Sequence, residues 1–253
     1  MVGPSSPPDW VRPQLAKLVE KAPDGHGWLH EIKFDGYRVH ARLDGAKAQI
    51  LTRRGNNWTA KYRVIGKSTA GLPAQNAYID GELCGVLPDG RTAFNLIQNA
   101  TDTGQGVLIF FLFYLLFLDG ENLMALPLVE RKARLASLLN GAPDCLRYND
   151  HQIAHGPAFH RLACEHGVEG IVSKRTNGRY EPDRRRRTWL KTKCLIEKNL
   201  SSWAGAIPRA ADIGSGRCCS AITHPKASSS MKVAPAPGCP SPSWSACGSV
   251  SSP

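Results

Sequence analysis

Zinc-binding cysteine pairs are absent from this sequence, although its 253 residues include 8 cysteines. No two cysteines have the CxxC spacing, so the pattern does not predict a zinc finger or zinc ribbon. Cys84, Cys145, Cys164 and Cys194 are scattered among ordinary residues, which is typical of a protein in a reducing cytosol. The first residues, MVGPSSPPDW, also lack the apolar core of a secretory signal. We therefore expect a cytoplasmic protein.

Apolar runs long enough to cross a bilayer are absent too. A membrane-spanning helix needs about 20 apolar residues, whereas the run VLIFFLFYLLFL extends only from Val107 to Leu118. A run of this length and composition predicts a fully buried central strand. We expect no membrane partner.

Acidic residues are few relative to basic ones. Asp and Glu number 21 against 32 Lys and Arg, which gives a formal net charge of +11 and a pI of about 9.4. This balance favours a polyanionic partner, nucleic acid before an anionic membrane surface, although a basic protein without such a partner would show the same charge. The length suits one large domain or two modest ones.

Helical and alternating patterns follow one another irregularly along the chain. A short amphipathic helix is predicted over 13–21, and the alternation over 28–51 predicts a hairpin with Asp44 and Gly45 at its turn. Further strands are predicted over 78–86, 168–174 and 188–193, and helices over 126–139 and 157–166. Because these elements do not alternate as βαβ units, the expected fold class is α+β rather than doubly wound α/β.

The segment EIKFDGYR, from Glu31 to Arg38, sets one lysine between two acids. In a strand, Glu31, Lys33 and Asp35 would share one face. A solvated ladder of ion pairs is the ordinary interpretation of such a face. The alternative is a nucleophilic lysine, which attacks only as the neutral amine and therefore needs burial or nearby positive charge. The two acids would then hold a metal or a substrate amino group.

Other short segments decide between these two interpretations. TRRGN, DGEL, PLVERKARL, EGIVSK and WLKTK follow EIKFDGYR in this order, each of them weak alone. Together they resemble the ATP-dependent DNA ligases, within the covalent nucleotidyltransferase superfamily. The likeness is greatest to the ligase domain of bacterial ligase D, which acts with Ku in non-homologous end joining. It extends from about Trp10 to Lys198.

The resemblance implies a role for each residue of the site. Lys33 would attack the α-phosphate of ATP and form a lysyl-AMP intermediate, with Asp35 and Gly36 shaping the loop beside it. A divalent ion, Mg²⁺ or Mn²⁺, would bind Glu169 and Glu82, because charge builds on the phosphate oxygens during the attack. The implied nucleotide-binding set has Glu31 and Phe113 on adenine and Glu82 on the ribose. Arg38 and Arg53 would hold ribose or phosphate, and Lys191 and Lys193 would grip the α-phosphate.

The resemblance also implies nicked or broken double-stranded DNA as the second substrate. AMP would pass to a 5′-phosphate, and the 3′-hydroxyl would displace it and seal the nick. Ku and separate primase and phosphoesterase modules are the implied partners, in the bacterial cytoplasm at the nucleoid. Contacts with the DNA backbone are expected from Lys174, Arg184, Arg185, Arg186 and Arg187.

Two features depart from the family, whose adenylation domain is an ATP-grasp-like fold of antiparallel sheets flanked by helices, expected here over 1–198. Tyr114 replaces an aspartate that usually follows the stacking aromatic residue, so the polar function of that aspartate is lost. Residues 199–253 are rich in Ser, Pro, Ala and Gly where the family has an OB fold, which predicts a disordered or frameshifted tail. The codons that could encode Cys218 to Pro225 can be read in another frame, starting from the third base of each codon. In that frame they permit the sequence LLLGYYSP, which resembles part of the OB domain.

Three functions remain open from the sequence. The leading one is a truncated and impaired ATP-dependent DNA ligase. An RNA ligase or mRNA-capping nucleotidyltransferase shares the KxDG core, but the ligase D-like segments argue against it. A non-catalytic remnant would bind DNA ends through its +11 charge without turnover.

Overall fold

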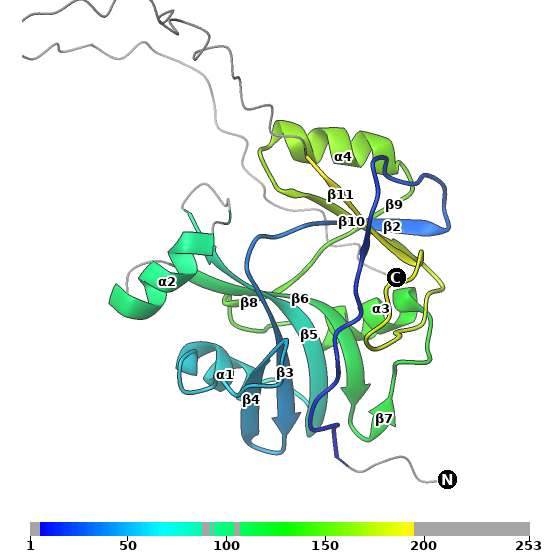
Figure 1. Cartoon of the computed structure of the whole chain (residues 1–253). Coiled ribbons are helices and arrows are strands. Elements are labelled where there is room, and N and C mark those ends of the chain that lie inside the picture. The colour runs from blue at the N-terminus through cyan, green and yellow to red at the C-terminus, as the bar shows by residue number, and fades with distance from the viewer. Residues whose placement is uncertain (1–5, 88–91, 93, 104–106, 195–253) are drawn as a thin grey trace, which may run out of the picture. The chain divides into compact units, whose positions relative to one another are not determined.

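The computed structural model describes residues 6–87, 92, 94–103 and 107–194, and the side chains of these except 99–103. Within this part the chain forms two mainly antiparallel sheets with helices beside them (Figure 1). The first has the order β4-β3-β5-β6-β7, and β8 runs parallel to β6. Its strands are β3 (Tyr37–Asp44), β4 (Lys47–Thr52), β5 (Asn76–Val86), β6 (Val107–Leu118), β7 (Glu121–Asn122) and β8 (Leu146–Tyr148).

The second sheet has the order β1-β11-β10-β2-β9, and only the pair β1 and β11 is parallel. It therefore joins the segment before the first sheet to segments far along the chain. Its strands are β1 (Lys17–Leu18), β2 (Trp28–Ile32), β9 (Gln152–Ile153), β10 (Gly170–Arg175) and β11 (Trp189–Lys193).

Four helices accompany the sheets in the described part of the chain. They are α1 (Arg63–Ala70), α2 (Phe94–Thr103), α3 (Leu128–Leu138) and α4 (Gly156–Glu165). Ile65, Ile97 and Leu135 bring α1, α2 and α3 into the core of the first sheet, whereas Ala163 of α4 packs with Ile171 of the second. None of these helices has the length and apolarity needed to cross a membrane.

Side-chain alternation divides the first sheet into a core face and a polar face. On β3, Val39 and Ala41 are fully buried in the core with the helices. Arg38 and His40 therefore face the other way, where both contact Asp80 of β5. This polar face meets the second sheet, since Tyr114 of β6 stacks on Trp189 of β11.

Most predicted elements are confirmed, but the helix at the N-terminus is not. β6 has the predicted bounds, and β5, β10, β11, α3 and α4 differ from prediction by one or two residues at either end. The predicted helix over 13–21 is wrong, because this segment is extended and its backbone bonds to distant partners: the Leu15 N–H to the Arg184 carbonyl and the Val19 N–H to the Lys191 carbonyl. Residues 13–21 thus gain no helical hydrogen bonds.

The predicted hairpin over 28–51 is only half right. β3 and β4 form a hairpin in which Asp44 pairs with Lys47 and Gly45 has a φ of 58°. β2, however, pairs with β10 and β9 in the other sheet. Alternation identified these strands but carried no information about which sheet each one joins.

Two of the scattered cysteines also meet in space. Cys164 of α4 and Cys194, directly after β11, form a disulfide. Cys84 and Cys145 are free thiols. The spacing in the sequence gave no sign of this pairing.

Candidate active site

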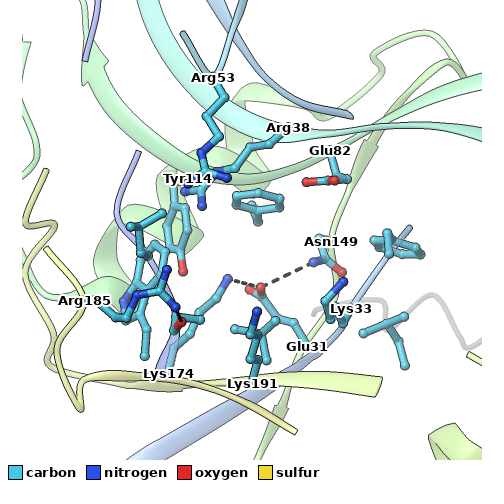
Figure 2. A pocket seen from close by; sticks show the side chains of 17 residues that line it. Glu31, Lys33, Arg38, Arg53, Glu82, Tyr114, Asn149, Lys174, Arg185 and Lys191 are labelled. Atoms are coloured by element: carbon cyan, nitrogen blue, oxygen red, sulfur yellow. Dashed lines mark hydrogen bonds and ion pairs between the residues drawn. The ribbon is translucent and has the colours of Figure 1, made fainter. Parts of the chain in front are cut away.

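A cavity of about 280 Å³ is lined by strands of both sheets (Figure 2). β2, β10 and β11 contribute from one sheet, and β3, β5 and β6 contribute from the other. Tyr114, Trp189 and Asn149 also line it. The predicted site residues that line the cavity are Glu31, Lys33, Arg38, Arg53, Glu82, Phe113, Lys174, Arg185 and Lys191.

Lys33 is the first residue after β2, and its ammonium forms an ion pair with Glu169. The second oxygen of Glu169 lies 3.4 Å from the Lys193 ammonium. Glu169 therefore connects Lys33, the predicted nucleophile, with Lys193 of β11. Neither Glu169 nor Lys193 lines the cavity itself. The solvated ladder of Glu31, Lys33 and Asp35 is wrong, because the strand ends at Ile32 and Lys33 pairs elsewhere.

Glu31 lies at the base of the cavity and is 1% exposed. One carboxylate oxygen accepts a bond of 2.6 Å from the Lys132 ammonium, and the other accepts bonds from Lys174 and from the Asn149 amide at 3.3 Å. Burial alone would raise the pKa of Glu31, but the two ammonium groups lower it below its usual range. Glu31 is therefore a fixed negative charge inside a positive wall.

Lys174 does not occupy the predicted position at the DNA backbone. It is 3% exposed, and its ammonium bonds to Glu31 and lies 4.1 Å from the centre of the Tyr114 ring. Burial lowers the pKa of Lys174 to about 7, against the attraction of Glu31. Its prediction as a DNA contact is corrected here, since a buried and paired ammonium belongs to the cavity wall.

Arg38 is held in place by Asp80. Its Nε and Nη2 groups donate to the two Asp80 oxygens at 3.0 and 2.6 Å, and Nη1 donates to the Gln14 carbonyl at 2.7 Å. The Tyr180 hydroxyl donates to Asp80 as well, at 3.0 Å. Burial would raise the pKa of Asp80, but Arg38 and His40 hold it well below its usual range. Most of the Arg38 donors are thus used to fix the guanidinium at the cavity edge.

Glu82 follows Asp80 on the same face of β5, two residues along the strand. Burial raises the pKa of Glu82 to about 7, although Arg38 and Lys33 act in the opposite direction. Glu82 and Glu169 both lie close enough to Lys33 to interact with it. Mg²⁺ is commonly held by one or two carboxylates, with phosphate and water oxygens completing its shell, so this donor set fits such an ion.

A β-bulge turns two consecutive aromatic residues toward the cavity. Gly81 of β5 pairs with Leu112 and Asp80 pairs with Tyr114, so Phe113 is an extra residue in β6. Phe113 and Tyr114 consequently both line the cavity, whereas a regular strand would turn one of them away. The strand forms with tyrosine at position 114, as predicted.

Cations without an ion pair gather on the cavity wall. In the described part of the chain, Arg53, Arg185 and Lys191 have no carboxylate within ion-pair distance, and all three side chains point inward in Figure 2. Desolvation, together with the charges of Lys33, Lys193 and Arg185, lowers the pKa of Lys191. Concentrated positive charge of this kind suits a phosphate group.

The four arginines predicted to contact DNA do not act alike. Arg185 lines the cavity and donates to the Ala16 carbonyl at 3.2 Å, and Arg186 pairs with Glu181 at 3.2 Å. Arg184 and Arg187 are exposed, and no ion pair joins them to a carboxylate of the described residues. Only these last two are wholly available to a backbone phosphate.

Two glycines are required where the chain passes the site. A Cβ atom on Gly36 would collide with the Leu83 carbonyl, which agrees with the predicted role of this residue in the loop after Lys33. Gly170 has a φ of 149°, and a Cβ atom there would collide with the Thr192 carbonyl. The residues following Lys33 and Glu169 are therefore fixed by close backbone contacts.

Sequence reasoning missed Lys132, Asp80 and Asn149. Lys132 had a usable signal, because it lies four residues after Leu128 and three before Leu135, on the apolar face of α3. Asp80 shares its strand face with Glu82, which was also visible. Asn149 lies between β8 and β9, and no pattern marks it.

Comparison with known proteins gives a consistent result. The family model described as ATP dependent DNA ligase domain matches residues 13–193. The multifunctional non-homologous end joining protein LigD of Pseudomonas aeruginosa is 37% identical over 200 residues, which cover 78% of this chain and 24% of that protein. The corresponding repair protein LigD of Mycobacterium tuberculosis is 30% identical over 194 residues, covering 74% and 25%. The chain thus spans about a quarter of the length of these relatives.

Solved structures show the same fold. The ligase domain of M. tuberculosis LigD matches with a TM-score of 0.66 and 29% identity, over 73% of this chain and 60% of that one. A mycobacterial DNA ligase D in complex with ATP and MES matches with a TM-score of 0.65 and 28% identity, over the same shares. These likenesses agree with the α+β class expected from the sequence.

Proposed function

Because this chain belongs to the ATP-dependent DNA ligase family, we propose that it activates and seals DNA ends through a lysyl-AMP intermediate formed on Lys33. The observation that carries the proposal is the position of Lys33. Its amine lies at a cavity whose wall also holds Arg53, Arg185 and Lys191, three cations without a described carboxylate partner. A nucleotide phosphate placed there would meet both the nucleophile and the charges that stabilise it.

The cavity separates a base subsite from a phosphate subsite. Adenine would lie against the Phe113 ring, near Glu31. The Glu31 carboxylate already accepts three hydrogen bonds, which leaves one of its roughly four lone-pair positions for the exocyclic amine of the base. The ribose would lie near Arg38 and Glu82, and the phosphates near Lys191, Arg53 and Arg185, which places the α-phosphate at Lys33.

In the first step, the neutral Lys33 amine would attack the α-phosphorus, and the bond to the pyrophosphate oxygen would break. Glu169 touches the Lys33 ammonium and holds it in place, and the proton that Nζ releases would pass to solvent. Lys191 and Arg185 would neutralise the charge that develops on the α-phosphate oxygens. Mg²⁺ held by Glu82 and Glu169 would supply further neutralisation of the phosphates.

The later steps return Lys33 to its starting form. A DNA 5′-phosphate oxygen would attack the phosphorus, and the phosphorus–nitrogen bond would break. The 3′-hydroxyl would then attack the 5′-phosphorus, with AMP as the leaving group. Nicked or broken double-stranded DNA is the proposed substrate, in end joining with Ku, primase and phosphoesterase modules, at the nucleoid in the bacterial cytoplasm. Its end-joining relatives and its net charge of +11 support this setting.

Covalent labelling with α-phosphate-labelled ATP tests the proposal. The purified chain should become labelled, and Lys33→Ala should abolish the label. Lys33→Arg should be equally inactive, because a guanidinium stays protonated at working pH. Lys47→Ala, at an exposed lysine at the start of β4, is the matched control and should label normally. Label that persists in Lys33→Ala would overturn the assignment, and an unlabelled wild-type chain would favour a non-catalytic DNA-binding protein.

The division into an adenylation domain over 1–198 and a frameshifted tail over 199–253 stays a hypothesis. The tail lies outside the described residues. The alternative-frame likeness to an OB domain supports the hypothesis, and so does the absence of any clear hydrophobic period in the written sequence. Sequencing the gene across the codons for Lys193 to Leu200 decides it.

A further inference from the structure

A second group of reactive side chains lies outside the cavity, where α4 approaches the end of β11. His160 and Cys164 stand one turn apart on α4, and Cys194 directly follows β11. The His160 Nε2 atom lies 3.5 Å from the Cys164 sulfur, and the two sulfurs form the disulfide. The three ligand atoms lie within 4.8 Å of one another, and all three residues are half-buried.

The chemistry of this group differs from that of the nucleotide cavity. Two thiolates and an imidazole are soft or borderline ligands, which Zn²⁺ prefers and Mg²⁺ does not. In tetrahedral geometry, a nitrogen about 2.0 Å and a sulfur about 2.3 Å from zinc are separated by about 3.5 Å. The observed distance from His160 Nε2 to Cys164 Sγ has this value.

The group stands apart within the described residues. No other three His, Cys, Asp or Glu side chains there come close enough to share an ion. The free thiols do not join it: Cys84 is buried in another cluster with Ile109 and Phe111, and Cys145 contacts the Ser68 hydroxyl at 3.1 Å. The site is therefore confined to one helix turn and one strand end.

We propose that His160, Cys164 and Cys194 form a zinc site when the two sulfurs are reduced, and that the disulfide is its metal-free oxidised form. A dithiol reduces the Cys164–Cys194 disulfide to two thiols and is itself oxidised to a disulfide, so that two electrons and two protons pass to the two sulfurs. Binding of Zn²⁺ then displaces both thiol protons. In the reverse direction, one peroxide molecule accepts two electrons from the two thiolates and, with two protons, becomes two waters, while the sulfurs join and the ion leaves. The two forms exclude each other because Zn²⁺ binds thiolates, and neither sulfur is a thiolate once the two are joined in a disulfide.

The change between the disulfide and zinc forms also affects the backbone at the end of β11, the strand that carries Lys191 and Lys193. In the oxidised form, His160 Nε2 lies 3.2 Å from the Lys193 carbonyl, to which an Nε2–H group donates. A metal at Nε2 requires its lone pair, so the ring proton moves to Nδ1 and this bond is lost. The Cys194 N–H also donates to the Glu169 carbonyl, at 3.0 Å. The site is thus joined directly to two residues of the proposed nucleotide chemistry.

Zinc content of the full chain tests the proposal. The protein is reduced with a phosphine under anaerobic conditions, loaded with Zn²⁺, passed over a desalting column with a weak chelator, and analysed by atomic absorption. The wild-type chain should retain about one zinc ion per molecule. Each of the variants Cys164→Ser, Cys194→Ser and His160→Ala should lose that ion. Cys145→Ser and the double variant Cys218→Ser/Cys219→Ser are the matched controls and should keep it.

The same zinc content in wild type and in Cys194→Ser would overturn the proposal, as would a reduced wild type that retains none. Co²⁺ in place of Zn²⁺ adds a spectroscopic measurement, because a thiolate-to-cobalt band should be present in wild type and weaker in each single cysteine variant.

Peroxide treatment of the loaded protein tests the exclusion of the two forms. Zinc release should parallel the appearance of a disulfide-linked peptide pair containing Cys164 and Cys194, measured by mass spectrometry. Zinc that stays bound after this disulfide has formed would show that the sulfurs are not its ligands.

Discussion

At Tyr114, a phenol group fills part of the wall of the cavity between the two sheets. Its ring stacks on Trp189 at 4.5 Å between centres and lies 5.5 Å from the Arg131 guanidinium. Arg131 is fully buried, and burial lowers its pKa. Aromatic rings and the carbonyls of Leu126 and Gly178, rather than a carboxylate, therefore surround this charge.

The Tyr114 hydroxyl has no hydrogen-bond partner within the described residues, although it is buried. Tyr114→Phe should therefore raise the free energy of unfolding by about 1 kcal/mol, because it removes an uncompensated polar group. Urea denaturation measures the change. Tyr78→Phe is the matched control, since that hydroxyl bonds to His40 at 2.7 Å and accepts from the Val11 N–H at 3.0 Å.

Tyr78→Phe should lower the free energy of unfolding by about 1–3 kcal/mol. Equal losses in the two variants would mean that the Tyr114 hydroxyl does have a partner.

Glu82 should make the stability of the fold depend on pH. Burial raises its pKa from 4.5 to about 7. Between these values the folded chain keeps a proton that the unfolded chain has lost, so the free energy of unfolding falls as pH rises through this range and is constant above it. Glu82→Gln removes this contribution. The free energy of unfolding of the variant minus that of wild type should therefore be larger at pH 8 than at pH 4.

Urea denaturation from pH 4 to pH 8 measures this difference between the two proteins. Arg38 and Lys33 face Glu82 and act against the shift. If the free energy of unfolding changed with pH in the same way for wild type and variant, the Glu82 carboxyl would have its ordinary pKa in the folded state.

At the scale of elements, the start of β10 couples stability to the site. Gly170 pairs with Lys193 of β11 and immediately follows Glu169, the partner of Lys33. Gly170→Ala should lower the free energy of unfolding by about 3 kcal/mol, because its φ is one that only glycine adopts readily and its Cβ would strike the Thr192 carbonyl. Lysyl-AMP labelling should fall as Glu169 is displaced.

Gly141→Ala separates backbone strain from collision. Gly141 also has a positive φ, of 74°, but no atom lies within 4 Å of the Cβ position. This variant should lose only about 1–2 kcal/mol and label normally. A loss in Gly170→Ala no greater than in Gly141→Ala, with labelling intact, would contradict the coupling of β10 to the site.

For the molecule as a whole, the net charge of +11 should appear in the salt dependence of DNA binding. Arg184, Arg185 and Arg187 are all exposed, but of these three only Arg185 also lines the cavity. The double variant Arg184→Ala/Arg187→Ala should reduce the slope of log K against log salt by about 2, with little effect on lysyl-AMP labelling. Fluorescence anisotropy with nicked duplex DNA measures the slope.

Arg185→Ala should behave in the opposite way, with slower labelling and a nearly unchanged salt slope. If all three arginines affected the slope equally and labelling not at all, the loop would act as one DNA-binding surface and Arg185 would have no part in the cavity.

The sequence by itself determined the family to which this protein belongs. The segments around Lys33, Glu82, Glu169 and Lys191 identified the family, and local periodicity predicted β5, β6, α3 and α4, because such patterns depend on neighbours in the chain. Lys132 was within reach of the same reasoning, as a charge on an apolar helix face.

Only the tertiary structure decided which residues meet. β2 joins β10 across more than a hundred residues, a bulge turns Phe113 and Tyr114 to the same cavity, and Lys174 lies buried against Glu31 rather than at the surface. Cys164 and Cys194 likewise meet only because α4 packs on the second sheet, of which β11 is a strand. The physical reason is that pairing between distant strands depends on the whole set of buried contacts, which no local pattern of charge or hydrophobicity contains.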